Sequence, residues 1–260
     1  MIYSSFVKSI LVCPETGNKL QPVENGFKRP DGKTYKIMDG ILSIVYPQDI
    51  SGSDKKMNAF YNMLAPLYDI NEQIMGKIIA GINMIEGRKD IVNYLNLRPG
   101  MKILEVSPGP GVFQKFLRNK IGFEGELVSL DLSLGMLWQC QKRNSHLNVQ
   151  LIHGNAQYLP FAENSFDAVF HFGGVNLFND PQKAISEFIR VTKDGGIVSW
   201  GDEGFAADYP NNLRRKILSK INAGYTKTRQ TIPATVFGAK EHEVYNGLGY
   251  LVVGKKTNRR

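Results

Sequence analysis

The most constraining feature of this 260-residue chain is a short apolar run that leads into a Gly/Pro-rich turn. Residues 102–106 read Lys-Ile-Leu-Glu-Val and are mostly apolar and β-prone, residues 107–111 read Ser-Pro-Gly-Pro-Gly, and residues 112–117 place apolar side chains at helical spacing. This pattern predicts a strand, a tight turn and a helix. Gly109 and Gly111 carry no Cβ, and the start of a helix offers free N–H groups. The turn therefore predicts a binding site for a small ligand.

A second predicted strand, 127–131, ends in the carboxylate Asp131 about twenty residues after the turn. A doubly wound fold places at this position the acid that binds ribose hydroxyls. The spacing G-x-G-x-x-G of NAD-binding proteins is broken, because Gln114 stands where the third small residue belongs. Gln114 and the acid Glu105 before the turn therefore disfavour a NAD-dependent oxidoreductase.

Four motifs in order make residues 58–256 resemble the class I S-adenosylmethionine-dependent methyltransferases. They are Glu105-Val106-Ser107-Pro108-Gly109-Pro110-Gly111, Asp131-Leu132-Ser133-Leu134-Gly135-Met136-Leu137, the stretch 154–161 (GNAQYLPF) and the stretch 165–169 (SFDAV). The chain is most similar to the ubiquinone/menaquinone C-methyltransferase-like branch, which also has a helix like the one predicted near residues 60–69. Ser107 replaces the family's first glycine, and Asn155 replaces an acid.

The resemblance implies an α/β fold, a doubly wound and mostly parallel seven-stranded sheet, with S-adenosyl-L-methionine as the cofactor. The alternation of strands and helices along the chain independently predicts a parallel sheet. Carried over residue by residue, the resemblance implies that the cofactor is bound by Tyr68, Glu105, Ser107, Gly109, Gly111, Asp131, Leu132, Met136, Asn155, Ala156 and Phe172.

The catalytic residues are less strongly indicated, because methyl transfer depends mainly on alignment of the reactants. His171, Asp202 and Glu203 lie at predicted strand ends that face the expected site, and His171 is the predicted base because histidine ordinarily titrates near neutrality. The N-P-P-Y type of tetrapeptide of nucleic-acid amino methyltransferases is absent after the fourth predicted strand. We therefore expect a methyltransferase acting on a small, aromatic or lipophilic acceptor.

Residues 1–50 form short β-prone runs between turns and are predicted to be a separate β-rich module before a methyltransferase domain at 51–260. The module resembles the zinc-ribbon-like domain of some ribosomal-RNA guanine methyltransferases, through Cys13-Pro14 with Leu20 and through Tyr35–Ile41. Tetrahedral zinc needs four donors, and Cys13 is the one cysteine in the module, so no metal is predicted. The module could serve as a substrate lid, a dimer contact or a cap.

The net charge of +8 is concentrated at the C-terminal end, where residues 214–260 contain eleven Lys/Arg and two Glu. Such a region attracts nucleic acid, an anionic membrane surface or an acidic substrate. An RNA methyltransferase or RNA-binding protein is therefore the alternative function, and a merely solvated basic surface is the alternative interpretation. The favoured partner is a small-molecule acceptor rather than nucleic acid.

Two cysteines are too few for a disulfide framework, and no apolar run reaches the length of a membrane span. The N-terminal residues do not resemble a signal peptide. These observations predict a cytoplasmic protein without a membrane span.

Overall fold

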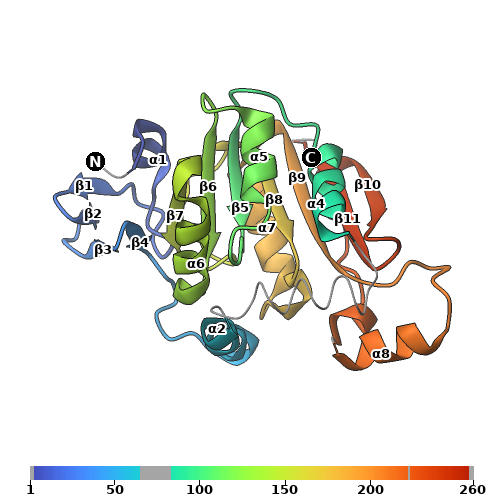
Figure 1. Ribbon diagram of the computed structural model, residues 1–260. Helices are drawn as coiled ribbons and strands as arrows, with labels where there is room; N and C mark the ends of the chain where they lie inside the picture. The colour runs from blue at the N-terminus through green and yellow to red at the C-terminus, as the bar shows by residue number, and fades with distance from the viewer. Residues whose placement is uncertain (1–2, 65–82, 222, 258–260) are drawn as a thin grey trace.

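The computed structural model describes residues 3–64, 83–221 and 223–257, which form a mixed sheet with helices on both faces (Figure 1). The strands lie in the order β1-β2-β3-β4-β7-β6-β5-β8-β9-β11-β10. They are β1 (Gln21–Val23), β2 (Gly26–Lys28), β3 (Thr34–Met38), β4 (Ile41–Ser43), β5 (Lys102–Val106), β6 (Glu126–Asp131), β7 (Val149–His153), β8 (Phe166–Phe172), β9 (Thr192–Glu203), β10 (Val236–Val244) and β11 (Gly249–Lys256). The helices are α1 (Ser5–Ile10), α2 (Gly52–Leu64), α4 (Met84–Tyr94), α5 (Gln114–Ile121), α6 (Leu134–Asn144), α7 (Pro181–Val191) and α8 (Leu213–Ile221).

The centre of the sheet is parallel, as predicted. β5 pairs with β6 on one side and with β8 on the other, and β7 and β9 continue the parallel arrangement outward. Ile103, Leu104 and Val106 of β5 are fully buried, because a parallel sheet covered on both faces needs apolar side chains on both. The chain crosses from β7 to the other side of β5 to form β8, which creates a switch point where open α/β sheets bind their ligands.

The helices begin where the sequence supplies a cap. Ser133 accepts a hydrogen bond from Met136 N at the start of α6, and Asp180 accepts one from Lys183 N before Pro181 opens α7. α4 and α5 contribute to one apolar core, while α1 and α7 contribute to another that includes Phe188 and Trp200. The sheet therefore lies between two layers of helices. These layers leave the edges of the sheet free to pair with other segments.

The sheet has eleven strands among the described residues, more than the seven predicted. The four additional strands are β1 to β4, which pair antiparallel with one another, and β4 then pairs in parallel with β7. Residues 102–256 alone supply seven strands. The number differs because the N-terminal module extends the same sheet; the predicted domain boundary at residue 50 remains a prediction.

The side chain of Tyr3 adds to the strand pairing that joins the module to the sheet. The hydroxyl of Tyr3 donates to the carbonyl of Leu151 in β7 at 2.5 Å and accepts from the N–H of Leu42 in β4 at 2.7 Å. Tyr3 is 3% exposed, and burial raises the pKa of its hydroxyl. The hydroxyl thus pairs backbone groups of two neighbouring strands that water does not reach.

Within the described ranges, no three His, Cys, Asp or Glu side chains are grouped as metal ligands would be. The module's Cys13 is buried, and its sulfur lies 3.2 Å from the hydroxyl of Tyr35. The similarity of the module to a zinc ribbon that has lost its metal ligands remains a prediction. No helix in the described part of the chain combines the length and the apolar character needed to cross a bilayer.

Replacing Tyr3 by Phe should leave the buried N–H of Leu42 without its acceptor. An unsatisfied buried donor costs on the order of 1–3 kcal/mol, so the free energy of unfolding should fall by about that amount in urea titrations. Tyr46→Phe is the matched control, because its ring packs on Tyr158 at 5.0 Å between centroids without a described hydrogen bond of its hydroxyl. Equal stability of the Tyr3 and Tyr46 variants would contradict this account of the seam.

Candidate functional site

The predicted cofactor residues come from adjacent strand ends at one edge of the sheet. Val106 lies opposite Leu130, and Asp131 lies opposite His153, so β5, β6 and β7 end side by side. Since parallel strands point the same way, the segments after their carboxyl ends meet at this edge, which we call the site edge.

The glycine turn after β5 is bonded directly to the acid at the end of β6. The N–H of Gly109 donates to Asp131 Oδ2 at 3.0 Å, and the N–H of Ser133 donates to Oδ1 at 2.8 Å. Asp131 is 8% exposed, and burial raises the pKa of its carboxyl to about 6 although backbone donors oppose the shift. The turn and the acid therefore form one unit.

The backbone of the turn has the left-handed conformation that favours glycine. Ser107 has φ +53° and Gly109 has φ +54°. Ser107 thus occupies a conformation that a glycine would adopt more easily, which fits the family's glycine at this position. A Cβ placed on Gly109 would meet nothing within 4 Å. The space over Gly109 is open, and a ligand can approach the backbone there.

Beneath the turn lies a buried polar network that supports it. Ser129 Oγ donates to Glu105 Oε2 at 2.8 Å and accepts from Gln114 Nε2 at 3.0 Å. Glu105 is 2% exposed, and burial raises the pKa of its carboxyl to about 7. Gln114 is fully buried and also contacts the sulfur of Cys140, so this residue that breaks the NAD spacing is part of the packing under the turn.

The second glycine of the turn faces protein rather than open space. A Cβ on Gly111 would lie 2.3 Å from Asn144 Nδ2 and 2.7 Å from Cys140 Sγ, both on α6. The carbonyl of Gly111 accepts from that same Asn144 amide at 2.9 Å. Gly111 therefore sets how closely the turn packs on α6.

The predicted residues beyond β6 and β7 lie at the same edge. Met136 is 2% exposed, Asn155 4% and Ala156 6%. The side-chain oxygen of Asn155 accepts from the N–H of Gln157 at 2.9 Å, and the carbonyl of Leu132 is bonded to His153 Nε2 at 3.1 Å. Hydrogen bonds thus hold the side chains of Asn155 and His153, while Met136 and Ala156 are buried.

Helix α2 closes over this edge through contacts that the sequence analysis did not identify. Asn62 Oδ1 accepts from Ser133 Oγ and from the N–H of Gly135, both at 2.8 Å. A Cβ on Gly135 would lie 2.9 Å from that oxygen and 3.2 Å from the Cα of Asn62. The first turn of α6 therefore needs a glycine where α2 crosses it.

The N-terminal end of α2 is fastened to the loops after β7 and β8. Asp54 is 6% exposed and accepts from Gln157 Nε2 at 2.5 Å and from the N–H of Asn179 at 2.9 Å. Asn179 Oδ1 in turn accepts from the N–H of Ser53 at 2.6 Å. Two separate anchors thus hold α2 over the site edge.

Tyr61 of α2 lies near the carboxylates of the site edge. Burial raises the pKa of its hydroxyl, and the negative charges of Glu203, Asp202 and Asp131 add to the effect. The helix was expected to contribute Tyr68, which lies outside the described residues. The expected contact of Tyr68 therefore stays a prediction.

Asp202, a sequence candidate, organises the loop after β8. Its two carboxylate oxygens accept from the N–H groups of Gly174 at 2.8 Å, of Asn176 at 2.9 Å and of Glu203 at 2.9 Å. Asp202 is 1% exposed. This carboxylate therefore shapes the site edge at the end of β9, with β5 and β8 lying between β9 and β6.

His171 and Phe172 lie at the end of β8 on opposite faces of the sheet. The His171 ring is fully buried next to Phe178 and Phe188, and its Nδ1 lies 2.9 Å from the carbonyl of Val106. Burial lowers the pKa of His171, and its Nε2 has no hydrogen-bond partner among the described residues. Phe172 packs between Phe113 and Tyr245. The predicted catalytic role of His171 remains a prediction.

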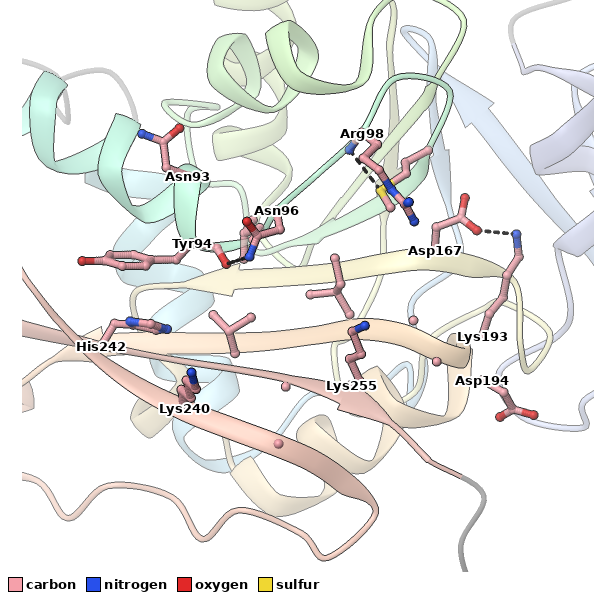
Figure 2. Close-up of a pocket in the computed structure, with 18 residues that line it drawn as sticks. Asn93, Tyr94, Asn96, Arg98, Asp167, Lys193, Asp194, Lys240, His242 and Lys255 are labelled. Carbon is pink, nitrogen blue, oxygen red and sulfur yellow. Dashed lines mark hydrogen bonds and ion pairs between the residues drawn. The ribbon is translucent and has the colours of Figure 1, made fainter.

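A separate hollow of about 770 Å³ lies at the opposite edge of the sheet, near the amino ends of β8 and β9. Figure 2 shows Tyr94 stacked on His242 at one end of this hollow and Lys193 paired with Asp167 at the other. None of the predicted cofactor residues lines it. The chemistry of the site edge is therefore independent of this hollow.

A family profile described as "Methyltransferase domain" matches residues 104–199. The chain is 31% identical over 197 residues to the demethylmenaquinone methyltransferase of Desulfitobacterium hafniense, covering 70% of this chain and 76% of that protein. It is 38% identical over 128 residues to the enzyme of the same name from Geobacillus stearothermophilus, covering 48% of this chain and 54% of that protein. The match thus spans about half of that second relative.

A solved structure shares the fold. It is described as an S-adenosyl-L-methionine-dependent methyltransferase from Methanococcus maripaludis and is similar with a TM-score of 0.53 at 18% identity. The similarity covers 82% of this chain and 98% of that one.

The buried carboxyl of Glu105 should make stability depend on pH. Its pKa of about 7 in the folded protein lies above the ordinary value of 4.5, so the stabilisation is present below about pH 4.5 and is lost as pH rises through about 7. Glu105→Gln removes this titrating group. Between those two pH values, the free energy of unfolding of the variant should therefore fall by about 3 kcal/mol less than that of the unmodified protein. Denaturant titrations between about pH 4.5 and about pH 7 measure the free energy of unfolding of both proteins.

Glu86→Gln is the matched control, because this glutamate lies exposed on α4. A Glu105→Gln variant whose stability falls with pH as steeply as the unmodified protein would show that Glu105 does not carry this dependence.

Proposed function

This chain belongs to the S-adenosylmethionine-dependent methyltransferases, in the family that includes the demethylmenaquinone methyltransferases, and we propose that it methylates a lipophilic, quinone-like acceptor. The proposal takes its acceptor class from the names of the two relatives described above. The RNA-directed alternative gains no support from these relatives. A cytoplasmic location remains a prediction.

The observation that carries the choice of S-adenosylmethionine as the cofactor is the hydrogen bond from the N–H of Gly109 in the glycine turn to the carboxylate of Asp131. A buried carboxylate at the end of the second strand can accept hydrogen bonds from two ribose hydroxyls, because each of its oxygens has a lone pair beyond the one used by the backbone. The open space over Gly109 leaves room for the rest of an adenosyl ligand. The residues present therefore fit the cofactor.

The other cofactor contacts follow from side chains that line the same edge. Leu132, Met136 and Ala156 are the proposed apolar neighbours of the adenine ring, and Asn155 has an amide that can bond to the polar edge of the ring. S-adenosylmethionine, when bound, supplies an electrophilic methyl group. The chain's own part is to align the two reactants and to keep water out, which α2 does by closing over the edge.

The acceptor is proposed to lie between Tyr61 and the loop that Asp202 holds. Tyr61 offers an aromatic face and a hydroxyl, while the adjacent carboxylates Asp202 and Glu203 provide negative charge beside the reacting ring. Methylation of an aromatic carbon releases a proton, so a base must stand within hydrogen-bond reach. His171 is the predicted base, and His171→Asn tests that role through the pH profile of the rate.

Asp131→Asn provides the central test. The loss of charge-assisted hydrogen bonds to the ribose should weaken binding of S-adenosylhomocysteine about 10- to 100-fold in isothermal titration calorimetry. In the unmodified protein, affinity should rise as pH increases through about 6, because the ionised carboxyl is the better acceptor. That dependence should be absent in the variant.

NAD is titrated in parallel, and methyl transfer is assayed with a short-chain demethylmenaquinol and with RNA. Tight binding of NAD without binding of either sulfur compound would refute the cofactor assignment. Unchanged affinity in Asp131→Asn would refute the site. Methylation of RNA but not of the quinol would refute the acceptor.

Gly135→Ala tests the closure by α2. Alanine favours the helix by up to about 1 kcal/mol, so α6 itself should not suffer. The added Cβ would nevertheless collide with Asn62, displace α2 and weaken binding of S-adenosylhomocysteine about ten-fold, equivalent to roughly 1.4 kcal/mol. Lys56→Ala, at an exposed position on α2, should leave the affinity unchanged. Equal affinities of the Gly135 and Lys56 variants would separate α2 from cofactor binding.

A further inference from the structure

Helix α8 presents apolar side chains to solvent. Leu213 is 73% exposed and Ile217 is 41% exposed, and their spacing of four residues places them on the same side of the helix. Leu218 lies on the other side, is 3% exposed and packs with Leu248. Packing of α8 against the protein thus uses Leu218 and leaves the Leu213–Ile217 side uncovered.

Two lysines border this uncovered side. At 100° per residue, Lys216 and Lys220 fall on the same arc of α8 as Leu213 and Ile217. Both lysines are exposed, and neither has a partner among the residues that the structure describes. α8 contains no acidic residue. Its solvent side therefore combines two apolar side chains with two lysines beside them.

Helix α2 has an equally unusual exposure at the same edge of the sheet. Phe60 is 45% exposed and Met63 is 73% exposed. Met63 and Leu213 are the two most exposed large apolar side chains in the described part of the chain. Figure 1 shows α2 and α8 both beyond the same end of the sheet, where β9 runs towards α8 and where the site edge lies.

From this arrangement we propose that α2 and α8 form a docking face, made of Phe60, Met63, Leu213, Ile217, Lys216 and Lys220, that binds an anionic lipid bilayer. Apolar side chains that enter the acyl boundary, flanked by lysines that reach headgroup phosphates, are the features by which a helix lies in a membrane interface. The lysines select for anionic lipid. A protein partner would not need these lysines, and RNA would not need the apolar side chains.

The docking face deepens the proposed function and rests on it. A lipophilic quinone resides in the bilayer, so an enzyme that acts on it gains from holding its site edge against the membrane. The docking face lies at that edge, whereas the exposed Phe123 and Phe237 belong to the opposite edge, near the starts of β6 and β10. The bilayer therefore meets the side of the molecule where the acceptor must enter.

The test measures binding of the full chain to vesicles by co-sedimentation. Vesicles of phosphatidylcholine mixed with phosphatidylglycerol should bind the protein, and binding should weaken in salt and on pure phosphatidylcholine. Lys216→Glu/Lys220→Glu should weaken partitioning about 30-fold or more, given the contribution expected of two basic residues near an anionic surface. Leu213→Ser/Ile217→Ser should weaken it about ten-fold.

Matched controls come from the opposite edge of the sheet. Lys240→Glu/Lys255→Glu makes the same charge change at two exposed lysines of the hollow in Figure 2. Phe123→Ser/Phe237→Ser removes two rings that are 68% and 62% exposed. Both control variants should bind vesicles as the unmodified protein does. Circular dichroism and affinity for S-adenosylhomocysteine, measured without vesicles, check that each variant is folded.

The outcomes separate docking from the proposed function. Equal loss of vesicle binding in the docking-face and control variants would overturn the docking face and leave only a diffuse basic charge. Preference for RNA over anionic vesicles, abolished by Lys216→Glu/Lys220→Glu, would also overturn it. Methylation of a short-chain quinol in free solution without vesicle binding would overturn docking alone, whereas vesicle binding without any quinol methylation would overturn the proposed function alone.

Discussion

The hydrogen bond from the N–H of Gly109 to the carboxylate of Asp131 is the contact on which the site edge depends. It joins the turn after β5 to the end of β6, so neither segment can shift without the other. The buried carboxylate would cost free energy if it were left alone, and the backbone donors of Gly109 and Ser133 offset part of that cost. Glu105 and Ser129 repeat the arrangement one layer below. The site is thus built from buried acids whose partners are fixed by the fold.

The parts that could be predicted from the sequence are those specified by nearby residues. The strand, turn and helix around Gly109 follow from local periodicity and turn chemistry, and the carboxylate of Asp131 follows from its distance along the chain. Both lie where they were expected at the edge of a parallel sheet. Ser107 also has the left-handed conformation that favours glycine, the residue that it replaces. Here the local sequence preferences and the tertiary structure agree. This agreement is why short motifs can be recognised in a sequence.

The parts that could not be predicted depend on contacts between distant segments. Asn62 is a polar residue on an exposed helix until α2 crosses Ser133, some seventy residues later. The predicted number of strands was wrong because β4 pairs with β7, which lies more than a hundred residues later in the chain. Tyr61 was not singled out from the sequence, because its closeness to Asp131, Asp202 and Glu203 depends on segments far along the chain. In each case the residue type is known from the sequence, but the distant residue that it contacts is not.

The added N-terminal strands also decide what the sheet offers to other molecules. Without them β7, an apolar parallel strand, would present its unpaired backbone groups at the border of the sheet. With them the border becomes β1, which has three residues and includes Pro22, a residue that cannot donate a ladder hydrogen bond. The opposite border, β10, is irregular between Phe237 and Lys240 and rich in charge beyond it. Both margins are therefore poor templates for strand addition, which protects the chain from self-association into fibrils.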